Sequence, residues 1–220
     1  MSIATNINII RTNIPSHVGL VCVSKFHSNE SIIEAYKNGE RIFGESKVQE
    51  LCDKYESLPK DIIWHFIGHL QTNKIKYLVP VVSLIHGVDT YKLLEEINKQ
   101  AHKFGKTINC LLQVHIAQED TKFGFSEAEL LEMLTTEEWK KLKNIQISGL
   151  MGMATYTQDR QQIRSEFRNL KSIFDKLKIE FFSANDYFSE ISMGMSDDYL
   201  IAIEEGSTLV RVGSSIFGKR

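Results

Sequence analysis

Short apolar runs of strand length alternate with segments of helical periodicity along this chain. Between Tyr91 and Phe104, for example, apolar residues recur every three or four positions, as on one face of a helix. Strands that alternate with helices join as parallel neighbours in one sheet. The pattern predicts an α/β fold, a single closed (β/α)8 TIM-type barrel, with an open doubly wound sheet as the alternative. The strand-length runs lie at Leu20–Ser24, Arg41–Phe43, Ile62–Ile67, Val82–Val88, Cys110–Ile116, Ile147–Met151, Phe188–Met193 and Thr208–Val212.

Capping residues indicate where several of the predicted helices begin and end. Asp89 is the predicted N-cap of the helix that follows it, and Ser126 with Glu129 has the spacing of a capping box. Glycine commonly follows the last turn of a helix because it adopts left-handed backbone angles without strain. We therefore expect helices to stop at Gly39, Gly105 and Gly206.

The length and charge of the chain narrow the classes of protein to which it can belong. Its 220 residues suit one domain over residues 1–220, and a net charge of −2 provides no basic field for nucleic acid. No apolar stretch approaches the length of a membrane span, and the N-terminus lacks a signal-peptide pattern. The three cysteines, an odd number, indicate reduced thiols. We expect a cytoplasmic protein that binds neither membrane nor nucleic acid.

Lys25 stands at the carboxyl end of the first apolar run, an unusual place for a lysine unless its amine has a task. Far along the chain, residues 192–198 and 211–215 have the small-residue composition of loops that bind an anion such as phosphate. In a closed barrel the last strand pairs with the first, so the lysine and these loops meet at the carboxyl end. An amine beside a phosphate site predicts an aldehyde phosphate as the ligand, and pyridoxal 5'-phosphate (PLP) is the first candidate.

Several longer motifs surround these positions: Leu20–Lys25, Phe43–Glu45, Val48–Leu51, Trp64–Lys74, Gly149–Met151, Ser192–Asp198 and Arg211–Gly218. Together they closely resemble the pyridoxal-phosphate homeostasis proteins, which share the N-terminal barrel of alanine racemase. The resemblance implies a single barrel of PLP fold type III, without the second β domain of alanine racemase. It further implies a Schiff base with PLP and no established catalytic reaction. The chain departs from the family at Ser46 and Lys47, where asparagine and tyrosine are common.

The resemblance and the chemistry of the side chains together give the expected site residues their roles. Lys25 is the predicted Schiff-base lysine, since burial in a barrel mouth favours the neutral amine that attacks an aldehyde. By analogy with the racemase barrel, Arg211 faces the pyridine nitrogen, which it leaves unprotonated because arginine can only donate. Ser196, Gly213 and Ser214 are predicted to hold the phosphate through short hydroxyls and backbone N–H groups.

Two of the expected cofactor-binding residues also have plainer structural interpretations. Arg211 could instead be a structural arginine that pairs with Glu204 or Glu205. Met151 is predicted to pack beside the cofactor ring, and an ordinary buried strand methionine is the alternative.

Three polar residues near strand ends give weaker signals. Lys122 is a candidate for a second amine that captures the cofactor transiently, with an ordinary loop lysine as the plainer interpretation. His65 and His69 are four residues apart, but on a strand-to-loop segment and without a cysteine or carboxylate cluster. That spacing is poor for a metal, so no metal site is expected.

The leading functional hypothesis is a non-catalytic carrier or buffer of PLP in intracellular homeostasis. The alternative is an amino-acid racemase, which needs acid–base groups on both faces of the substrate carbon, whereas only Lys25 is evident here. A cofactor-free Schiff-base aldolase is a further rival, but no proton-shuttling carboxylate or tyrosine is evident beside the lysine. The expected partners are PLP and, transiently, PLP-dependent apoenzymes, and the protein is expected to be a monomer.

Overall fold

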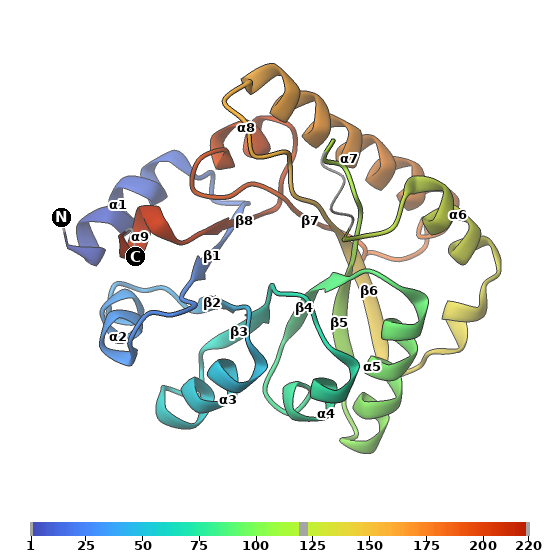
Figure 1. Cartoon of the computed structure of the whole chain (residues 1–220), viewed down its shortest axis with the longest axis horizontal. Helices are drawn as coiled ribbons and strands as arrows, with labels where there is room; N and C mark the ends of the chain where they lie inside the picture. The colour runs from blue at the N-terminus through green and yellow to red at the C-terminus, as the bar shows by residue number, and fades with distance from the viewer. Residues whose placement is uncertain (1, 119–122, 219–220) are drawn as a thin grey trace.

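Eight parallel strands form a closed barrel in the computed structural model, which describes residues 2–118 and 123–218 (Figure 1). The strands follow one another around the ring in chain order, and the eighth pairs with the first. The predicted barrel is confirmed, and the open sheet is excluded. The strands are β1 Gly19–Val23, β2 Ile42–Glu45, β3 Ile63–Phe66, β4 Leu84–Val88, β5 Ile108–Gln113, β6 Ile145–Met151, β7 Glu190–Ser192 and β8 Leu209–Val212.

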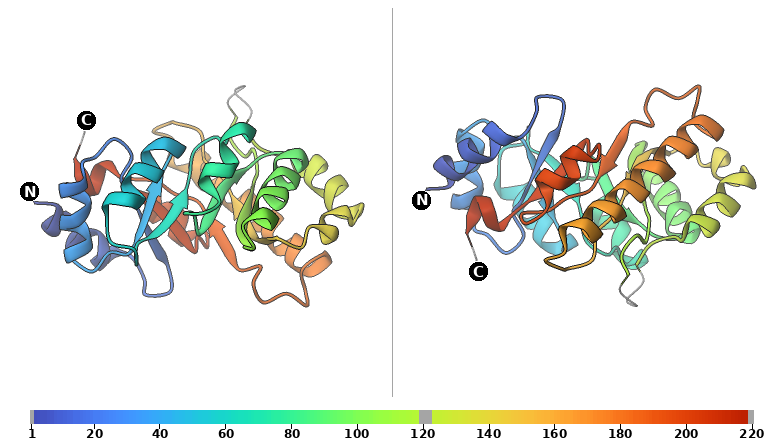
Figure 2. Two further views of the ribbon diagram at one scale, coloured as in Figure 1. Left: turned by 90° about the horizontal axis from the view of Figure 1, so that it is seen from below. Right: turned by 90° about the horizontal axis from the view of Figure 1, so that it is seen from above.

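Helices between the strands cover the outside of the barrel, as Figure 2 shows from two sides. The long helix α7 buries the apolar stripe that begins with Ile163, Phe167 and Leu170. A stripe of this kind is the usual way in which a surface helix packs on a sheet. The helical elements of the described residues are α1 Ile3–Asn13, α2 Asn29–Lys37, α3 Val48–Ser57, η1 Thr72–Lys74, α4 Ile75–Leu78, α5 Tyr91–Lys103, α6 Glu127–Thr135, η2 Glu138–Lys141, α7 Arg160–Glu180, α8 Tyr199–Glu204 and α9 Ser214–Phe217.

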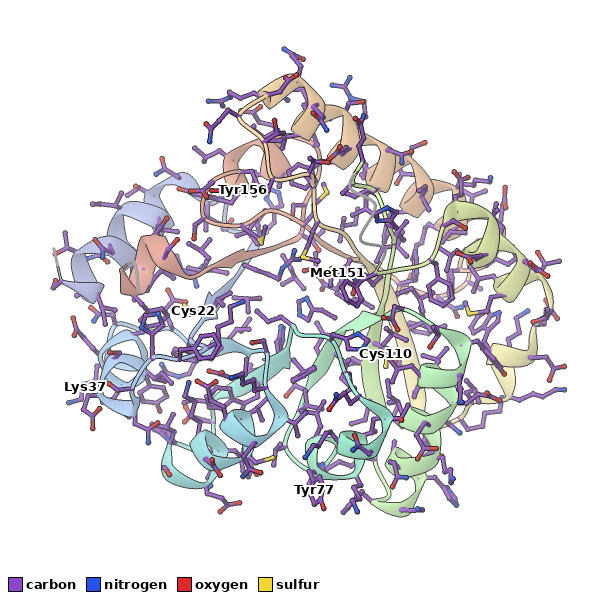
Figure 3. All side chains as sticks on the ribbon, viewed as in Figure 1. Cys22, Lys37, Tyr77, Cys110, Met151 and Tyr156 are labelled. Carbon is purple, nitrogen blue, oxygen red and sulfur yellow. The ribbon has the colours of Figure 1, made fainter. Side chains whose placement is uncertain are left out.

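The buried apolar side chains form two zones, one inside the ring of strands and one between the strands and the helices. Val21, Leu84, Leu111, Met151 and Leu209 pack together in the inner zone. Figure 3 shows Met151 near the middle of the ring. Side chains that alternate with these along each strand belong to the larger outer zone. The inner cluster makes the barrel a packed core rather than a pore, which leaves its ends for a ligand.

The two ends of the chain meet at the seam of the barrel. β1 and β8 pair in register, with Val21 opposite Arg211. Outside the seam α1 lies beside α9, where the side-chain Nδ2 of Asn6 donates to the carbonyl oxygen of Ile216 at 2.9 Å (Figure 1). The expected meeting of the first and last strands is confirmed. It brings the tip of β1 and the segment after β8 to the same end of the barrel.

Most of the predicted helix boundaries are confirmed. Ser126 caps α6, and it forms the full capping box with Glu129. Positive φ angles occur at the glycines that follow α2, α5 and α8, which are Gly39, Gly105 and Gly206.

The predicted N-cap of α5 is wrong by one residue, because Thr90 rather than Asp89 caps this helix. The Thr90 hydroxyl accepts a hydrogen bond from the backbone N–H of Leu93 at 3.2 Å. Asp89 turns to His69 instead, with 3.4 Å between its Oδ2 and the imidazole Nδ1. Both residue types can cap a helix, so the contact with His69 decides between them.

The expected reduced cysteines and the absence of a membrane span can be compared with the structure. All three cysteines are free, with Cys22 and Cys110 buried and Cys52 partly exposed. In the described ranges, no helix combines the length and the apolar character that crossing a bilayer requires.

Candidate functional site

A cavity of about 610 Å³ lies at the carboxyl ends of the strands. Lys25 and His27 after β1, and residues 153–158 after β6, line part of it. Residues 195–198 after β7 and residues 213–214 after β8 also line it. The volume is in the range of small-molecule and cofactor sites, and barrels of this type carry their sites at this end.

Lys25 reaches this cavity because of the alternation along β1. Val21 lies in the inner zone, so Val23 and Lys25 share the inner side with it. Both Val23 and Lys25 line the cavity, as the strand pattern predicts. Phe26 then has a φ of 65°, a left-handed angle that is uncommon for a residue other than glycine. The chain therefore turns sharply directly after the lysine.

A buried network of charged side chains supports both neighbours of Lys25. The Lys54 Nζ donates to the Ser24 carbonyl oxygen at 2.9 Å, to Glu45 Oε1 at 2.8 Å and to Glu50 Oε1 at 2.7 Å. The Ser24 hydroxyl also donates to Glu45 Oε1 at 2.6 Å, and the Phe26 N–H donates to Glu50 Oε1 at 2.5 Å. Burial raises the pKa of Glu45, although Lys54 and Ser24 oppose that shift. The network fixes the backbone on either side of the lysine.

Sequence reasoning missed this network. Glu50 and Lys54 are four residues apart on α3, the spacing of an ordinary exposed ion pair on a helix. Glu45 is fully buried and Lys54 is 6% exposed, a depth that nothing local in the sequence indicates. The Phe43–Glu45 and Val48–Leu51 motifs, which contain Glu45 and Glu50, are the signals that pointed to this segment.

The predicted phosphate residues lie together at the start of α9. The Ser196 hydroxyl accepts from the backbone N–H of Gly213 at 3.2 Å and from that of Ser215 at 3.5 Å. A Cβ at Gly213 would lie 3.2 Å from the Cβ and the carbonyl oxygen of Val23, so this position is tightly packed. Ser196, Gly213 and Ser214 all line the cavity. Convergent amides and hydroxyls of this kind suit an anion.

The segment between β7 and α8 carries two acidic residues directly before the helix, which begins at Tyr199. Asp198 accepts from the backbone N–H of Met195 at 2.5 Å, and burial raises the pKa of Asp198. Asp197 lines the cavity mouth and is exposed. Helix α8 has only six residues, so the amides around Ser196 are the main polar groups of the anion cradle. The cradle consists of Ser196, Gly213, Ser214 and Ser215.

Arg211 lies inside the barrel, 4% exposed, and lines the cavity. Its Nη1 donates to the carbonyl oxygen of Ser192 at 2.9 Å and to the Ser192 Oγ at 2.5 Å, and its Nη2 donates to the Gly152 carbonyl oxygen at 3.2 Å. Burial lowers the pKa of Arg211 to about 10, so the side chain stays charged at neutral pH.

The alternative in which Arg211 pairs with Glu204 or Glu205 is wrong. Arg164 of α7 forms ion pairs with both of these glutamates, and Arg168 pairs with Glu205 at 3.1 Å. The two glutamates lie at the end of α8, outside the barrel, whereas β8 directs Arg211 into it.

The outer wall of the cavity is anchored to α7. Glu166, 6% exposed, accepts from the backbone N–H of Thr155 at 2.7 Å and from the Thr155 hydroxyl at 2.8 Å. Tyr156, the next residue, is 85% exposed and lies towards α8 in Figure 3. No sequence pattern indicated this wall, because residues 153–158 form neither a strand nor a helix.

Other residues that the sequence singled out lie away from the cavity lining. Met151 belongs to the inner apolar cluster, and Met153 lines the cavity in its place, so contact between Met151 and a ligand stays a prediction. Ser46 does not line the cavity, and Lys47 lies over the Phe26 ring, 4.7 Å from its centroid. Lys122 falls outside the described residues.

The two histidines considered as metal ligands have different neighbours. His65 points into the barrel, where it contacts His86, and His69 contacts Asp89. Across the described part of the chain, no three or more histidine, cysteine and carboxylate side chains gather in a way that could hold a metal ion.

Comparison with known proteins first gives the class of barrel. The family model of the alanine racemase N-terminal domain matches residues 1–220. An alanine racemase of Clostridium difficile shares the fold with a TM-score of 0.79 at 16% identity, over 100% of this chain and 56% of that one. The fold is that of the N-terminal barrel domain of alanine racemases.

Closer relatives narrow this class. The pyridoxal phosphate homeostasis protein of Aquifex aeolicus is 41% identical over 202 residues, which are 91% of this chain and 86% of that protein. The structure of PipY of Synechococcus elongatus with PLP bound has a TM-score of 0.89 and 33% identity, over 99% of this chain and 100% of that chain. This chain belongs to the pyridoxal phosphate homeostasis protein family. The resemblance in the sequence motifs is thereby confirmed.

Proposed function

We propose that this protein binds PLP in the cavity at the carboxyl end of the barrel, through a Schiff base with Lys25. Its function is then intracellular PLP homeostasis, as a non-catalytic carrier or buffer of the cofactor. The observation that carries the proposal is that the Lys25 amine and the cradle around Ser196 line the same cavity. The relative PipY, which covers almost the whole chain, has a structure with PLP bound.

The residues of the cavity fit the three parts of this cofactor. The amine of Lys25 suits the aldehyde, with which it would form a carbon–nitrogen double bond with release of water. The amides of Gly213 and Ser215, now directed at the Ser196 hydroxyl, suit a phosphate that accepts from all three groups. Arg211 supplies a charged donor to the cavity that would suit the pyridine nitrogen.

The charge of Arg211 limits how strongly bound PLP would stabilise a carbanion. Bound PLP supplies an electron sink for a carbanion, and that sink is strongest when its ring nitrogen is protonated. Arginine can only donate, so Arg211 leaves the ring nitrogen without a proton. Removal of the α-proton from a bound amino acid would then keep much of its activation barrier.

One observation favours the racemase alternative enough to be tested. Racemisation needs a second acid–base group on the face opposite Lys25, and both Tyr156 and His27 line the cavity. The His27 ring stacks on Phe217 with 4.8 Å between centroids, and Tyr156 is largely exposed. Neither side chain is buried.

Exchange of the α-proton of alanine in heavy water tests the non-catalytic proposal. Loading of the wild type with PLP is first checked by visible absorbance. We then expect the loaded protein to exchange the α-proton of L- and D-alanine for deuterium no faster than the Lys25→Ala variant does. Rapid exchange with inversion that is lost in Lys25→Ala would make the protein a racemase. Loss of that exchange in Tyr156→Phe, but not in a Tyr77→Phe control, would identify the second base.

We further propose that the chain acts as a single domain over residues 1–220, as a monomer in the cytoplasm. PLP-dependent apoenzymes are the proposed transient partners. The support for such partners is the exposed rim of the cavity, where Met153 is 41% and Tyr156 is 85% exposed.

A further inference from the structure

A chain of hydrogen-bonded side chains crosses the inside of the barrel below the cavity. Arg211 of β8 donates to the Oγ of Ser192 on β7 at 2.5 Å. The Ser192 Oγ lies 2.8 Å from the Nδ1 of His86 on β4. The His86 Nε2 lies 3.0 Å from the Nδ1 of His65 on β3. All four residues are buried, and Ser192 and His86 are fully so.

The arginine at one end fixes the direction of every bond in this chain. An arginine only donates, so the Ser192 oxygen accepts from Arg211 and its hydroxyl proton points to His86. The His86 Nδ1 must then accept, which places the ring proton of His86 on Nε2. That proton is donated to the Nδ1 of His65, whose own ring proton is therefore also on Nε2. Both histidines are expected as the Nε2–H tautomer.

The opposite direction leaves a buried group without a partner. If His86 donated from Nδ1, the Ser192 oxygen would accept two bonds, and its hydroxyl proton would have no acceptor among the described residues. A fully buried hydroxyl without an acceptor is costly. The histidines must also be neutral, and burial favours this, since it lowers the pKa of His65 to about 4 and that of His86 well below the usual value.

The hydrogen-bond chain determines which protons of Arg211 remain for a ligand. Both protons of Nη1 go to Ser192, one to its carbonyl oxygen and one to its hydroxyl. One proton of Nη2 goes to the carbonyl oxygen of Gly152. Among the described residues, no acceptor is recorded for the other Nη2 proton or for the Nε proton. These two remain for a group in the cavity that Arg211 lines.

We propose that His86 is a positioning residue for Arg211, acting through the Ser192 hydroxyl, and that His65 secures the tautomer of His86. The hydrogen-bond chain holds Nη1 against β7, so that the remaining Nη2 and Nε protons are presented to the cavity, where the ring nitrogen of a bound pyridine would accept one of them. This inference rests on the proposed binding of PLP. Nothing in the local sequence around His86 indicates it, because the four residues come from four different strands.

The tautomers can be measured without any cofactor. Ring ¹⁵N–¹H correlation spectra of the PLP-free protein should show both His65 and His86 protonated on Nε2 alone. Single-residue assignment comes from the His65→Gln and His86→Asn spectra. Either histidine protonated on Nδ1 at neutral pH would overturn the proposal, whatever the protein binds.

Two isosteric variants of His86 then test the positioning role. The Oδ1 of asparagine takes the place of Nδ1, so His86→Asn keeps the acceptor for Ser192 and loses the contact with His65. In His86→Gln the amide takes the place of Nε2, so the contact with His65 is kept and the acceptor for Ser192 is lost. A purely structural role predicts similar effects of the two variants.

The positioning role predicts that only His86→Gln weakens PLP binding, by about tenfold, the value of one charge-assisted hydrogen bond. It also predicts an altered visible spectrum of bound PLP in that variant alone. His86→Asn and the exposed His102→Gln control should keep the wild-type affinity and spectrum. Equal affinities for the Asn and Gln variants at equal thermal stability would overturn the proposal. A wild-type protein that binds no PLP would instead refute the proposed function. The measured histidine tautomers would still show whether the hydrogen bonds have the inferred direction.

Discussion

At the scale of single residues, the position of Lys25 depends on side chains that never enter the cavity. Lys54 holds the carbonyl oxygen of Ser24, and Glu50 holds the N–H of Phe26, so the peptide units before and after the lysine are both fixed. Fixing the backbone in this way presents the amine without the entropy loss that a mobile loop would suffer on binding. Glu45 completes the network, but its second oxygen has no hydrogen-bond partner among the described residues.

Lys54→Met should destabilise the fold strongly, because it leaves Glu45 buried without its cation. Removal of one partner from a buried ion pair typically lowers the unfolding free energy by about 3–5 kcal/mol. A carboxyl whose folded pKa is raised, as burial raises that of Glu45, stabilises the fold in acid and loses this contribution as the pH rises through the folded pKa. Lys54→Met removes the cation that opposes the shift. The loss should therefore be largest near neutral pH and smaller as the pH falls.

Urea denaturation at a series of pH values measures this effect. The matched control is Lys60→Met, which removes an exposed lysine 3.9 Å from Glu56, and it should change the unfolding free energy little at any pH. A Lys54→Met loss that is small, or that grows in acid, would show that the network does not carry a buried charge.

Ser196→Ala should weaken the binding of PLP more than it weakens the fold. Its hydroxyl is half-buried and contacts the amides of Gly213 and Ser215, so little apolar packing is lost. One charge-assisted hydrogen bond to phosphate is worth about 1.5–3 kcal/mol, or roughly ten- to a hundredfold in affinity. Equilibrium titration by absorbance measures the change, with the exposed Ser57→Ala as control. An unchanged affinity would place the phosphate elsewhere.

At the scale of helices and strands, the sequence predicted which elements exist better than it predicted the residues at which they begin and end. Each apolar run became a strand because a strand inside a ring of parallel neighbours is buried on both faces. The prediction failed at the start of α5, where Asp89 and Thr90 are both good caps. The capping preferences of aspartate and threonine are too similar to separate two such neighbours. The structure differs between them because Asp89 contacts His69, which lies in a different loop, and Thr90 caps the helix.

Substitution of the two candidate caps should show which one stabilises α5. Thr90→Ala removes the acceptor for the Leu93 N–H and should lower the unfolding free energy by about 1 kcal/mol. Asp89→Ala removes only a contact with the half-exposed His69 and should cost less. Chemical denaturation of both variants gives the comparison, and a larger loss for Asp89→Ala would reverse the assignment.

At the scale of the whole molecule, closure of the barrel is what turns separate sequence signals into a site. Lys25 and Gly213 are distant in the chain, yet β1 and β8 are neighbours, so the general rule for parallel barrels was enough to predict their meeting. Lys54 and His86 could not be predicted in the same way. Their partners lie on other strands and helices, and no local pattern records distances across a barrel.

The identity of the lysine that carries the cofactor is the central claim, and borohydride reduction tests it most directly. The protein is loaded with PLP, reduced, digested and mapped by peptide mass spectrometry. The cavity predicts one stable pyridoxyl adduct, on Lys25, together with loss of the visible absorbance band. The matched control is Lys47→Ala, because Lys47 lies over Phe26 beside the tip of β1 but does not line the cavity, and this variant should keep the adduct. A reduced adduct on another lysine, or a Lys25→Ala protein that still forms the reducible coloured species, would contradict the account.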